Sequence, residues 1–283
     1  MTLIEKINNR IKNLPTLPTV FYAISNALAD PRVTNKEIAK IISDDQASSF
    51  KVLKIANSAF YGFRSRVDTI SQAIMILGFN EIRNIVLALS IINLFSKEKE
   101  SMNFNPVGFW EHSIAVGIIT RVIGNEAGPI NLESYFISGI LHDIGKLFLY
   151  LYAGKEYAAV FRTIEEKNCL LQEAEKEILG FDHCMIGASV AEKWGLSPNI
   201  IYAIKYHETG PVLEKHNRLV ATVHIADIFA RMLELGNAGD ELVPQPNLKA
   251  WEILNLSEDA FTRINKLIIP DFDATVSLLL TDK

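Results

Sequence analysis

Cysteine is scarce in this chain, and so are long apolar runs. Only Cys169 and Cys184 occur among the 283 residues, too few for a disulfide framework and compatible with a reducing compartment. No apolar run reaches the ~18 residues that a membrane span needs, and the first residues lack the apolar core of a signal peptide. These absences predict a cytoplasmic protein that has no membrane partner.

Positive charge is also in short supply. The chain has 28 lysines and arginines against 33 aspartates and glutamates, which gives a formal net charge of -5 and a pI of about 5.7. This balance argues against broad attachment to nucleic acid or to an anionic membrane, although it leaves room for a local basic patch. Apolar residues are plentiful at 49%, enough to bury one large core or two modest ones.

Apolar residues recur at helical spacing along most of the sequence, as in Val20, Ile24 and Leu28, and strand-like alternation is rare. These patterns predict an all-α fold. The stretch from Ile74 to Leu94 is apolar on almost all sides, which is typical of a helix buried at the centre of a fold. Further helices are predicted near residues 19–29, 109–126, 133–152, 154–166, 170–179, 183–193, 198–206, 215–235, 248–254 and 257–267.

Polar residues mark helix starts and one linker. Thr34 with Glu37, and Thr69 with Gln72, have the spacing of capping boxes, in which side chains satisfy the free backbone donors of a helix start. The polar segment 96–105 ends at a proline and is the best candidate for a linker. It would separate an N-terminal helical half from the rest of the chain.

The six histidines all lie between positions 112 and 224. Most are on or beside predicted helices, and imidazole and carboxylate groups on facing helices can converge in a bundle core to bind a metal. Mixed nitrogen and oxygen ligands suit iron, manganese or zinc, and the adjacent His142 and Asp143 point in different directions, which allows one or two ions. The candidate ligands are His112, His142, Asp143, His183, His207 and Asp227.

Other residues near these ligands have more than one interpretation. Lys146, four residues after His142, would share its helical face and could meet a phosphate oxygen as a catalytic group. His224, three residues before Asp227, either orients that carboxylate or packs in the core. His216 has polar neighbours and is interpreted as an ordinary histidine, as any single histidine usually is.

The order of the ligands points to a known superfamily. The HD superfamily of metal-dependent phosphohydrolases resembles this chain in the order of four residues that hold its metal, here His112, His142, Asp143 and Asp227. His-Asp-Ile-Gly-Lys at 142–146, His183 and Tyr-His-Glu at 206–208 are similar to the HD-GYP branch. That branch contains the cyclic-di-GMP phosphodiesterases, whose added histidines bind further metal.

The chain departs from that branch at two places. The HD-GYP pattern has a His-His-Glu triplet followed shortly by Gly-Tyr-Pro, whereas here Tyr206 replaces the first histidine and residues 209–211 are Thr-Gly-Pro. A ligand and a substrate-binding element of the phosphodiesterases are therefore missing.

The N-terminal half carries longer and more specific motifs. Residues 14–18 are Leu-Pro-Thr-Leu-Pro and residues 41–45 are Ile-Ile-Ser-Asp-Asp. Residues 52–61 are Val-Leu-Lys-Ile-Ala-Asn-Ser-Ala-Phe-Tyr, and residues 70–78 are Ile-Ser-Gln-Ala-Ile-Met-Ile-Leu-Gly. Together these motifs resemble the HD-related output domain (HDOD) family, over residues 11–208.

This resemblance implies a multi-helix, HD-domain-like bundle with an N-terminal helical half packed on it. The helical half would cover residues 11–95 and the HD-like half residues 106–208, with residues 209–283 completing the HD-like bundle. The family implies a role in bacterial signal transduction, often beside receiver or cyclic-dinucleotide modules. Its members have commonly lost the hydrolase ligands, and this sequence keeps unusually many of them.

Three functions follow from these observations. The first is a regulatory domain that acts through contacts with signalling proteins and holds a vestigial or structural metal; Tyr206 favours it, and residues 57–61 would form either internal packing or a contact surface. The second is a metal-dependent phosphodiesterase or phosphohydrolase, in which Lys146 steadies the charge of a small phosphorylated ligand. The third is DNA binding through two short helices, which Asp44 and Asp45 disfavour because they would repel phosphate.

Overall fold

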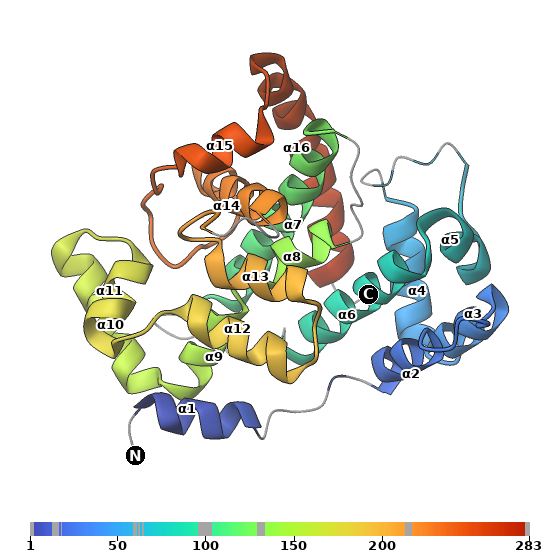
Figure 1. The fold of residues 1–283 in the computed structure, drawn as a ribbon, viewed down its shortest axis with the longest axis horizontal. Helices are drawn as coiled ribbons and strands as arrows, with labels where there is room; N and C mark the ends of the chain where they lie inside the picture. Colours follow the sequence, from blue (N-terminus) through green and yellow to red (C-terminus); the bar gives the residue numbers. More distant parts are fainter. Residues whose placement is uncertain are drawn as a thin grey trace. The chain divides into compact units, whose positions relative to one another are not determined.

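The computed structural model of the chain describes residues 3–12, 17, 19–58, 61, 63, 65–95, 104–128, 134–212 and 217–280. Every regular element within these ranges is an α-helix, so the all-α prediction is confirmed (Figure 1). The chain divides into two compact units: unit 1 comprises residues 1–15 and 98–264, and unit 2 comprises residues 16–97 and 265–283. Most of the 14–18 motif, residues 96–103 of the linker, and His216 lie outside the described residues.

Unit 2 is built on helices whose starts the sequence predicted. Its elements are α2 Thr19–Ala27, α3 Asn35–Ser43, α4 Gln46–Ala56, α5 Ile70–Leu77, α6 Phe79–Phe95 and residues 265–280 of α16 Glu258–Leu280. Both capping boxes are formed, because Thr34 Oγ1 accepts from the Glu37 amide and Thr69 Oγ1 accepts from the Gln72 amide. Helix α6 packs against α2, α4 and α5 and is buried over most of its surface.

The prediction of one helix over residues 74–94 is wrong. The helix breaks at Gly78, whose φ of 83° lies in the left-handed region that favours glycine, and α5 and α6 meet there at 117°. Apolar spacing continues across the bend, which hid it in the sequence. Within the described ranges, no single helix has both the length and the apolar composition of a membrane span; α5 and α6 reach them only as this bent pair.

The segment after α4 makes contacts inside unit 2. The Asn57 side chain donates to the carbonyl oxygens of Leu53 and Val67 and accepts from the Val67 amide, which closes the chain between α4 and α5. Tyr61 donates its hydroxyl proton to Glu81. These bonds favour the packing interpretation for Asn57 and Tyr61, whereas residues 59 and 60 lie outside the described residues.

Unit 1 is a helical bundle centred on two long helices that pack on each other, α7 Pro106–Glu126 and α14 Asn217–Met232. Its other elements are α1 Leu3–Lys12, α8 Tyr135–Leu141, α9 Ile144–Tyr152, α10 Gly154–Lys167, α11 Leu171–Leu179, α12 His183–Lys193, α13 Pro198–Tyr206, α15 Leu248–Leu254 and residues 258–264 of α16. Helix α7 packs against α8 and α14, and α13 contacts both α8 and α14. The interior of this bundle is therefore lined by α7, α8, α13 and α14.

Near each end of the chain, the observed helix differs from the prediction. Helix α1 was not predicted; it forms because Ile7 and Ile11, four residues apart, are buried where α1 packs on α9 and α12. Helix α16 was predicted to end near residue 267, but it continues to Leu280. Burial of Ile268 and Leu279 explains how packing outweighs the proline within the helix.

The predicted helix 133–152 is also divided, and the division creates the site. Helix α8 ends at Leu141 and α9 begins at Ile144, so that His142 and Asp143 occupy the turn between them. Directly after this turn, α9 crosses α12 in backbone contact: a Cβ atom on Gly145 would lie 1.9 Å from the carbonyl oxygen of His183. Gly145 therefore allows the turn to approach the start of α12.

Gly145→Ala tests this crossing. The added methyl group must push α9 and α12 apart, so we expect the urea midpoint to fall and the free energy of unfolding to drop by about 3 kcal/mol. Gly154→Ala is the matched control, because a Cβ atom there would meet no atom within 4 Å. The control should be as stable as the native chain or more stable by about 0.4–1 kcal/mol. Equal stability of the two variants would contradict the close crossing.

Candidate metal centre

Unit 1 brings all six predicted ligand residues into one buried cluster. Helix α7 supplies His112 from its middle, and the turn between α8 and α9 supplies His142 and Asp143. Three further residues lie at the start of α12, directly after α13 and on α14; they are His183, His207 and Asp227. None of the six is more than 2% exposed. Residues up to 115 positions apart therefore form a single site.

His112, His142 and Asp227 form the first part of the cluster. The Nε2 atom of His112 lies 2.9 Å from Asp227 Oδ1, and His142 Nε2 lies 3.7 Å from the same oxygen. Each residue offers one ligand atom, and these atoms all lie within 4.8 Å of one another. Small side-chain movements would bring them to the ~2.0–2.2 Å bonds of one transition-metal ion.

Asp143 joins this part to a second pair of histidines. Its Oδ2 atom lies 3.2 Å from His142 Nε2, and its Oδ1 atom lies 3.4 Å from His183 Nε2 and 3.3 Å from His207 Nε2. The two Nε2 atoms of His183 and His207 are themselves 3.3 Å apart. One carboxylate thus faces two sets of nitrogen ligands, an arrangement that suits an oxygen ligand shared by two ions.

Every histidine of the cluster is held in place through its other ring nitrogen. The Nδ1 atoms of three of them donate to backbone carbonyl oxygens: His112 to Leu235 at 3.3 Å, His142 to Gly139 at 2.6 Å and His207 to Ile204 at 2.8 Å. His183 Nδ1 donates to the Glu175 carboxylate at 2.6 Å. These bonds fix the ring orientations and turn the four Nε2 atoms inward, as outer partners do in metal sites.

Two buried atoms that face into the cluster are available to bind an ion. Among the described residues, His142 Nε2 and Asp143 Oδ1 are buried and have no hydrogen-bond partner. An unpaired buried polar atom costs about 1–3 kcal/mol. A cation that accepts both lone pairs removes this cost, and the nitrogen and oxygen donors fit a divalent transition metal. The cluster can therefore hold a metal.

Cationic neighbours keep both aspartates ionised. In the metal-free chain, burial raises the pKa of Asp143, but the imidazolium form of His142 and then Lys146 outweigh it and hold the pKa of that carboxyl well below its ordinary value; a bound ion would take the place of the proton on His142 Nε2. Burial likewise opposes the charge of Asp227, and the Arg231 guanidinium beside it is the main cause of a pKa well below the ordinary value. Both aspartates are thus anionic and are suitable ligands for a cation.

Arg231 is a site residue that the sequence analysis did not include. Its Nε atom lies 3.3 Å from Asp227, its Nη2 atom lies 3.4 Å from Glu208, and its Nη1 atom lies 3.2 Å from both oxygens of Asp240. Its spacing of four from Asp227 on one helix is the local signal that could have identified it. Arg231 balances three buried carboxylates.

Glu175 is a second residue without a predicted role. It accepts from the backbone amide of His183 at 2.9 Å as well as from the ring, and it accepts the hydroxyl proton of Tyr157 at 2.7 Å. Glu175 is fully buried. Its contact with His183 depends on how α11 packs beside the start of α12, and no spacing rule reveals that in the sequence.

Lys146 does not share a face with His142, because the helix breaks between them. Its Nζ atom donates to Asp143 Oδ2 at 2.6 Å and to the Ala238 carbonyl oxygen at 2.8 Å, and the residue is 5% exposed. The positive charge of Lys146 is therefore next to the cluster, and its action on a phosphate oxygen stays a prediction.

His224 and Cys184 lie beside the cluster. His224 donates from Nδ1 to the carbonyl oxygen of His207 at 2.6 Å and accepts at Nε2 from the Asn247 amide at 2.9 Å, so it packs α14 against its neighbours and makes no hydrogen bond to Asp227. Cys184 lies with its sulfur 3.9 Å from His207 Nδ1, and it forms with His183 and His207 a further group of residues that could hold a metal.

Known proteins are similar to this chain over most of its length. The sequence profile of the HDOD domain family matches residues 14–209. A solved HDOD domain protein with unknown function from Geobacter sulfurreducens is 28% identical, with a TM-score of 0.78 over 94% of this chain and 93% of that one. A candidate phosphohydrolase from Shewanella amazonensis SB2B, 23% identical, shares the fold with a TM-score of 0.73 over 98% and 97% of the two chains.

A longer relative is also similar. An uncharacterized protein of Treponema pallidum is 27% identical over 255 residues, which are 89% of this chain and 48% of that protein. The chain thus spans about half the length of this curated relative.

Arg231→Met tests the charge balance of the site. The variant leaves three buried carboxylates without their shared cation, so we expect the free energy of unfolding of the metal-free protein to fall by about 3–5 kcal/mol. Arg263→Met is the control, because that arginine pairs with Glu126 and its side chain is 52% exposed. The control should leave the urea midpoint almost unchanged. Similar losses in both variants would mean that Arg231 balances no buried charge.

His142→Ala tests the ligand set. We expect the variant, reconstituted beside the native chain, to bind a transition metal at least about tenfold more weakly, measured by elemental analysis after dialysis. His224→Gln is the control, since His224 is buried near the cluster but makes no hydrogen bond to the side chain of a candidate ligand, and it should retain the metal. If the His142 variant kept as much metal as the native chain, His142 would not be a ligand.

Proposed function

The chain belongs to the HDOD family, and we propose that it is a regulatory output domain of bacterial signal transduction that encloses one or two divalent transition-metal ions. Iron, manganese or zinc suits the donors. The observation that carries the proposal is enclosure: six side chains can hold an ion, and none is more than 2% exposed. An ion at this depth joins parts of the fold and does not meet a large substrate.

The positions of the candidate ligands support a structural role for the ion. His112, His142, Asp143 and Asp227 would hold one ion, and His183 and His207 would hold another with Asp143 shared between them. These residues come from α7, from the turn before α9, and from the α12, α13 and α14 segments, so one centre would join most of unit 1. Because such a site exists only in the folded chain, the binding free energy adds to folding stability.

We also propose that the domain acts by contacting other signalling proteins in the bacterial cytoplasm. The family supports it, and so does the side chain at the position where the HD-GYP phosphodiesterases have a ligand histidine. Tyr206 stacks there on Tyr202 along α13, with 6.0 Å between ring centroids. A chain with this substitution has lost one hydrolase ligand while keeping the others.

A metal-dependent phosphohydrolase, with cyclic-dinucleotide phosphodiesterases as one class, is the second candidate function. Lys146 favours it, because this residue lines a cavity of unit 1 and contacts Asp143. A bound divalent ion supplies Lewis acidity at a phosphoryl oxygen. Lys146 would then exchange its bond to Asp143 for one to a phosphate oxygen of a small phosphorylated ligand.

DNA binding has weaker support. Helices α3 and α4 are two short helices joined by a tight turn, as a helix-turn-helix unit requires. The turn carries Asp44 and Asp45, and Asp45 is used to accept the hydroxyl proton of Ser48 at 2.7 Å. These carboxylates would face phosphate groups, so nucleic acid is not a partner in this proposal.

Metal removal tests the structural role. At an ion concentration 100-fold above the dissociation constant, the ion stabilises the folded state by about 2.7 kcal/mol. For a domain of this size we expect EDTA to lower the thermal midpoint by about 5–10 °C. Calorimetry of protein loaded with Mn²⁺, Fe²⁺ or Zn²⁺, before and after EDTA, measures the shift. The His142→Ala variant is the control, and its thermal midpoint should be the same with and without metal.

The loaded protein also separates the two candidate functions. We expect no hydrolysis of cyclic di-GMP or of bis-p-nitrophenyl phosphate above that of the His142→Ala variant. Turnover by the native chain that disappears in this variant would contradict the regulatory proposal and support the phosphohydrolase.

A further inference from the structure

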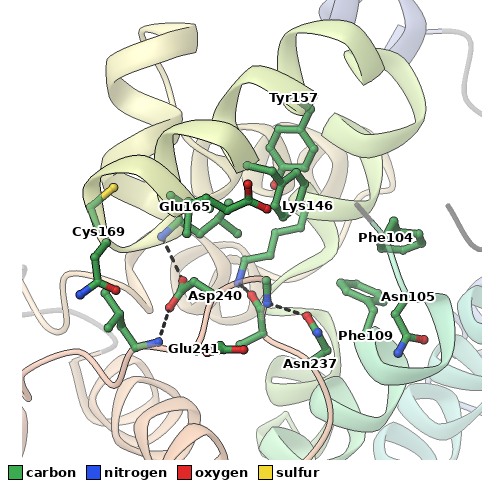
Figure 2. Close-up of a pocket in the computed structure, with 17 residues that line it drawn as sticks. Phe104, Asn105, Phe109, Lys146, Tyr157, Glu165, Cys169, Asn237, Asp240 and Glu241 are labelled. Carbon is green, nitrogen blue, oxygen red and sulfur yellow. Dashed lines mark hydrogen bonds between the residues drawn. The ribbon is translucent and has the colours of Figure 1, made fainter. Parts of the chain in front are cut away.

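Unit 1 contains a cavity of about 600 Å³ beside the ligand cluster, within the size range of small-molecule sites. Its walls come from the segment before α7, from α9 and α10, and from the loop 237–242 that follows α14. Figure 2 shows Phe104 and Phe109 on one side of the cavity, with Tyr157 and Lys146 above the loop that carries Asp240. The cavity is thus lined by aromatic rings and by polar groups.

Two residues that line this cavity are linked to the ligand cluster by hydrogen bonds, one directly and one through Glu175. Lys146 donates directly to Asp143 at 2.6 Å. Tyr157 donates to Glu175 at 2.7 Å, and the other oxygen of Glu175 accepts from His183 Nδ1 at 2.6 Å. A molecule in the cavity would therefore touch side chains that set the positions of Asp143 and His183.

A third residue of the lining reaches the cluster through one arginine. Asp240 accepts from Arg231 at 3.2 Å, and Arg231 lies 3.3 Å from Asp227. Asp240 also accepts from the backbone amide of Leu171 at 2.9 Å, which fixes the loop against the start of α11. The cavity and the cluster are thus two sides of one layer of bonded residues.

The charges of the lining disfavour a phosphorylated occupant. Among the described residues that line the cavity, the one cationic side chain is Lys146, which is already paired with Asp143, and Asp240 is paired with Arg231. The other ionisable acids of the lining are Glu165 and Glu241, both exposed at the rim. The field at the entrance is therefore negative, and it would repel a phosphate group.

The uncharged groups of the lining favour a flat ring that carries hydrogen-bonding groups at its edge. The rings of Phe104, Phe109 and Phe161 line the cavity, and Phe104 keeps one face beyond the one that stacks on Tyr150; a base stacked on such a ring gains about 1–3 kcal/mol. Side-chain amides come from Asn105, Asn168 and Asn237; because the oxygens of Asn105 and Asn237 already accept from the backbone amides of Gly108 and Gly239, these two residues offer mainly N–H donors to the edge of a ring. The rim carboxylates accept from N–H or hydroxyl groups. A nucleoside offers all of these complementary groups.

We propose that this cavity binds an uncharged nucleoside and that the bound nucleoside strengthens metal binding in the cluster. The coupling rests on the proposed function, whereas the binding of the nucleoside does not. A ring in the cavity holds Tyr157 and Lys146 where they bond Glu175 and Asp143, so the nucleoside and the ion stabilise the same conformation. Each must then raise the affinity of the other by the same factor.

Calorimetric titration of the full chain with adenosine and guanosine, and with AMP and GMP as charged counterparts, tests the occupant. We expect at least one nucleoside to bind the metal-free protein, and its monophosphate to bind about tenfold or more weakly. Phe161→Ala removes a stacking face and should weaken nucleoside binding about tenfold. Glu165→Gln changes an exposed residue and should leave folding intact. Because it removes a negative charge at the rim, it should reduce the difference in affinity between the nucleoside and its monophosphate.

The coupling is tested by repeating the titrations on Zn²⁺- and Mn²⁺-loaded protein. We expect the nucleoside to bind about fivefold or more tightly when metal is present. Tyr157→Phe keeps the ring but removes its bond to Glu175, so the variant should bind nucleoside normally without metal and show a smaller increase with metal. Metal affinity, measured with and without nucleoside, must change by the same factor.

Different results would contradict nucleoside binding, its coupling to the metal, and the proposed enclosed ion. No nucleoside binding to metal-free protein, or a monophosphate that binds as tightly as its nucleoside, overturns the assignment of the cavity. Equal nucleoside affinity with and without bound metal overturns the coupling. A chain that binds nucleoside but takes up no metal supports the cavity assignment and contradicts both the coupling and the enclosed ion.

Discussion

The position of one carboxylate, that of Asp143, constrains the whole of unit 1. Each of its oxygens faces a different group of imidazole nitrogens, and the side chain is fully buried. A charge at this depth is costly unless cations or an ion surround it. Lys146 supplies one cation, and the inward-facing histidines complete the surroundings. The helix break before α9 and the missing side chain at Gly145 are the backbone conditions that let this group reach its partners.

The six candidate ligands were predictable because most of them belong to short motifs. His142 and Asp143 are adjacent, and His183, His207 and Asp227 lie at helix ends or on a helix where a bundle can bring them together. Glu175 and Tyr157 were not predictable, since their contacts depend on how α10 and α11 pack beside α12. The contact between Arg231 and Asp227 could have been predicted, because the two residues are four positions apart on one helix.

The fold was predictable as a class and less so in its breaks. Helical spacing of apolar residues reports which positions are buried, and it continues through a bend without interruption. For that reason the turn at residues 142–143 and the bend at Gly78 were both missed. The error at residues 142–143 affected chemistry as well, because Lys146 was assigned to the face of His142 and instead pairs with Asp143. The break at residues 142–143 thus determines the contacts of the site residues more than the helices around it do.

Enclosure is the property that would make a bound ion structural and not catalytic in this chain. The X-ray absorption spectrum of the metal-loaded protein tests it most directly, because it reports the atoms bound to the ion. We expect imidazole and carboxylate bound to the ion, and a spectrum that does not change when phosphate or a phosphodiester analogue is added. A spectrum of oxygen ligands alone, or one that changes when phosphate is added, would contradict an ion enclosed by the histidine and aspartate cluster.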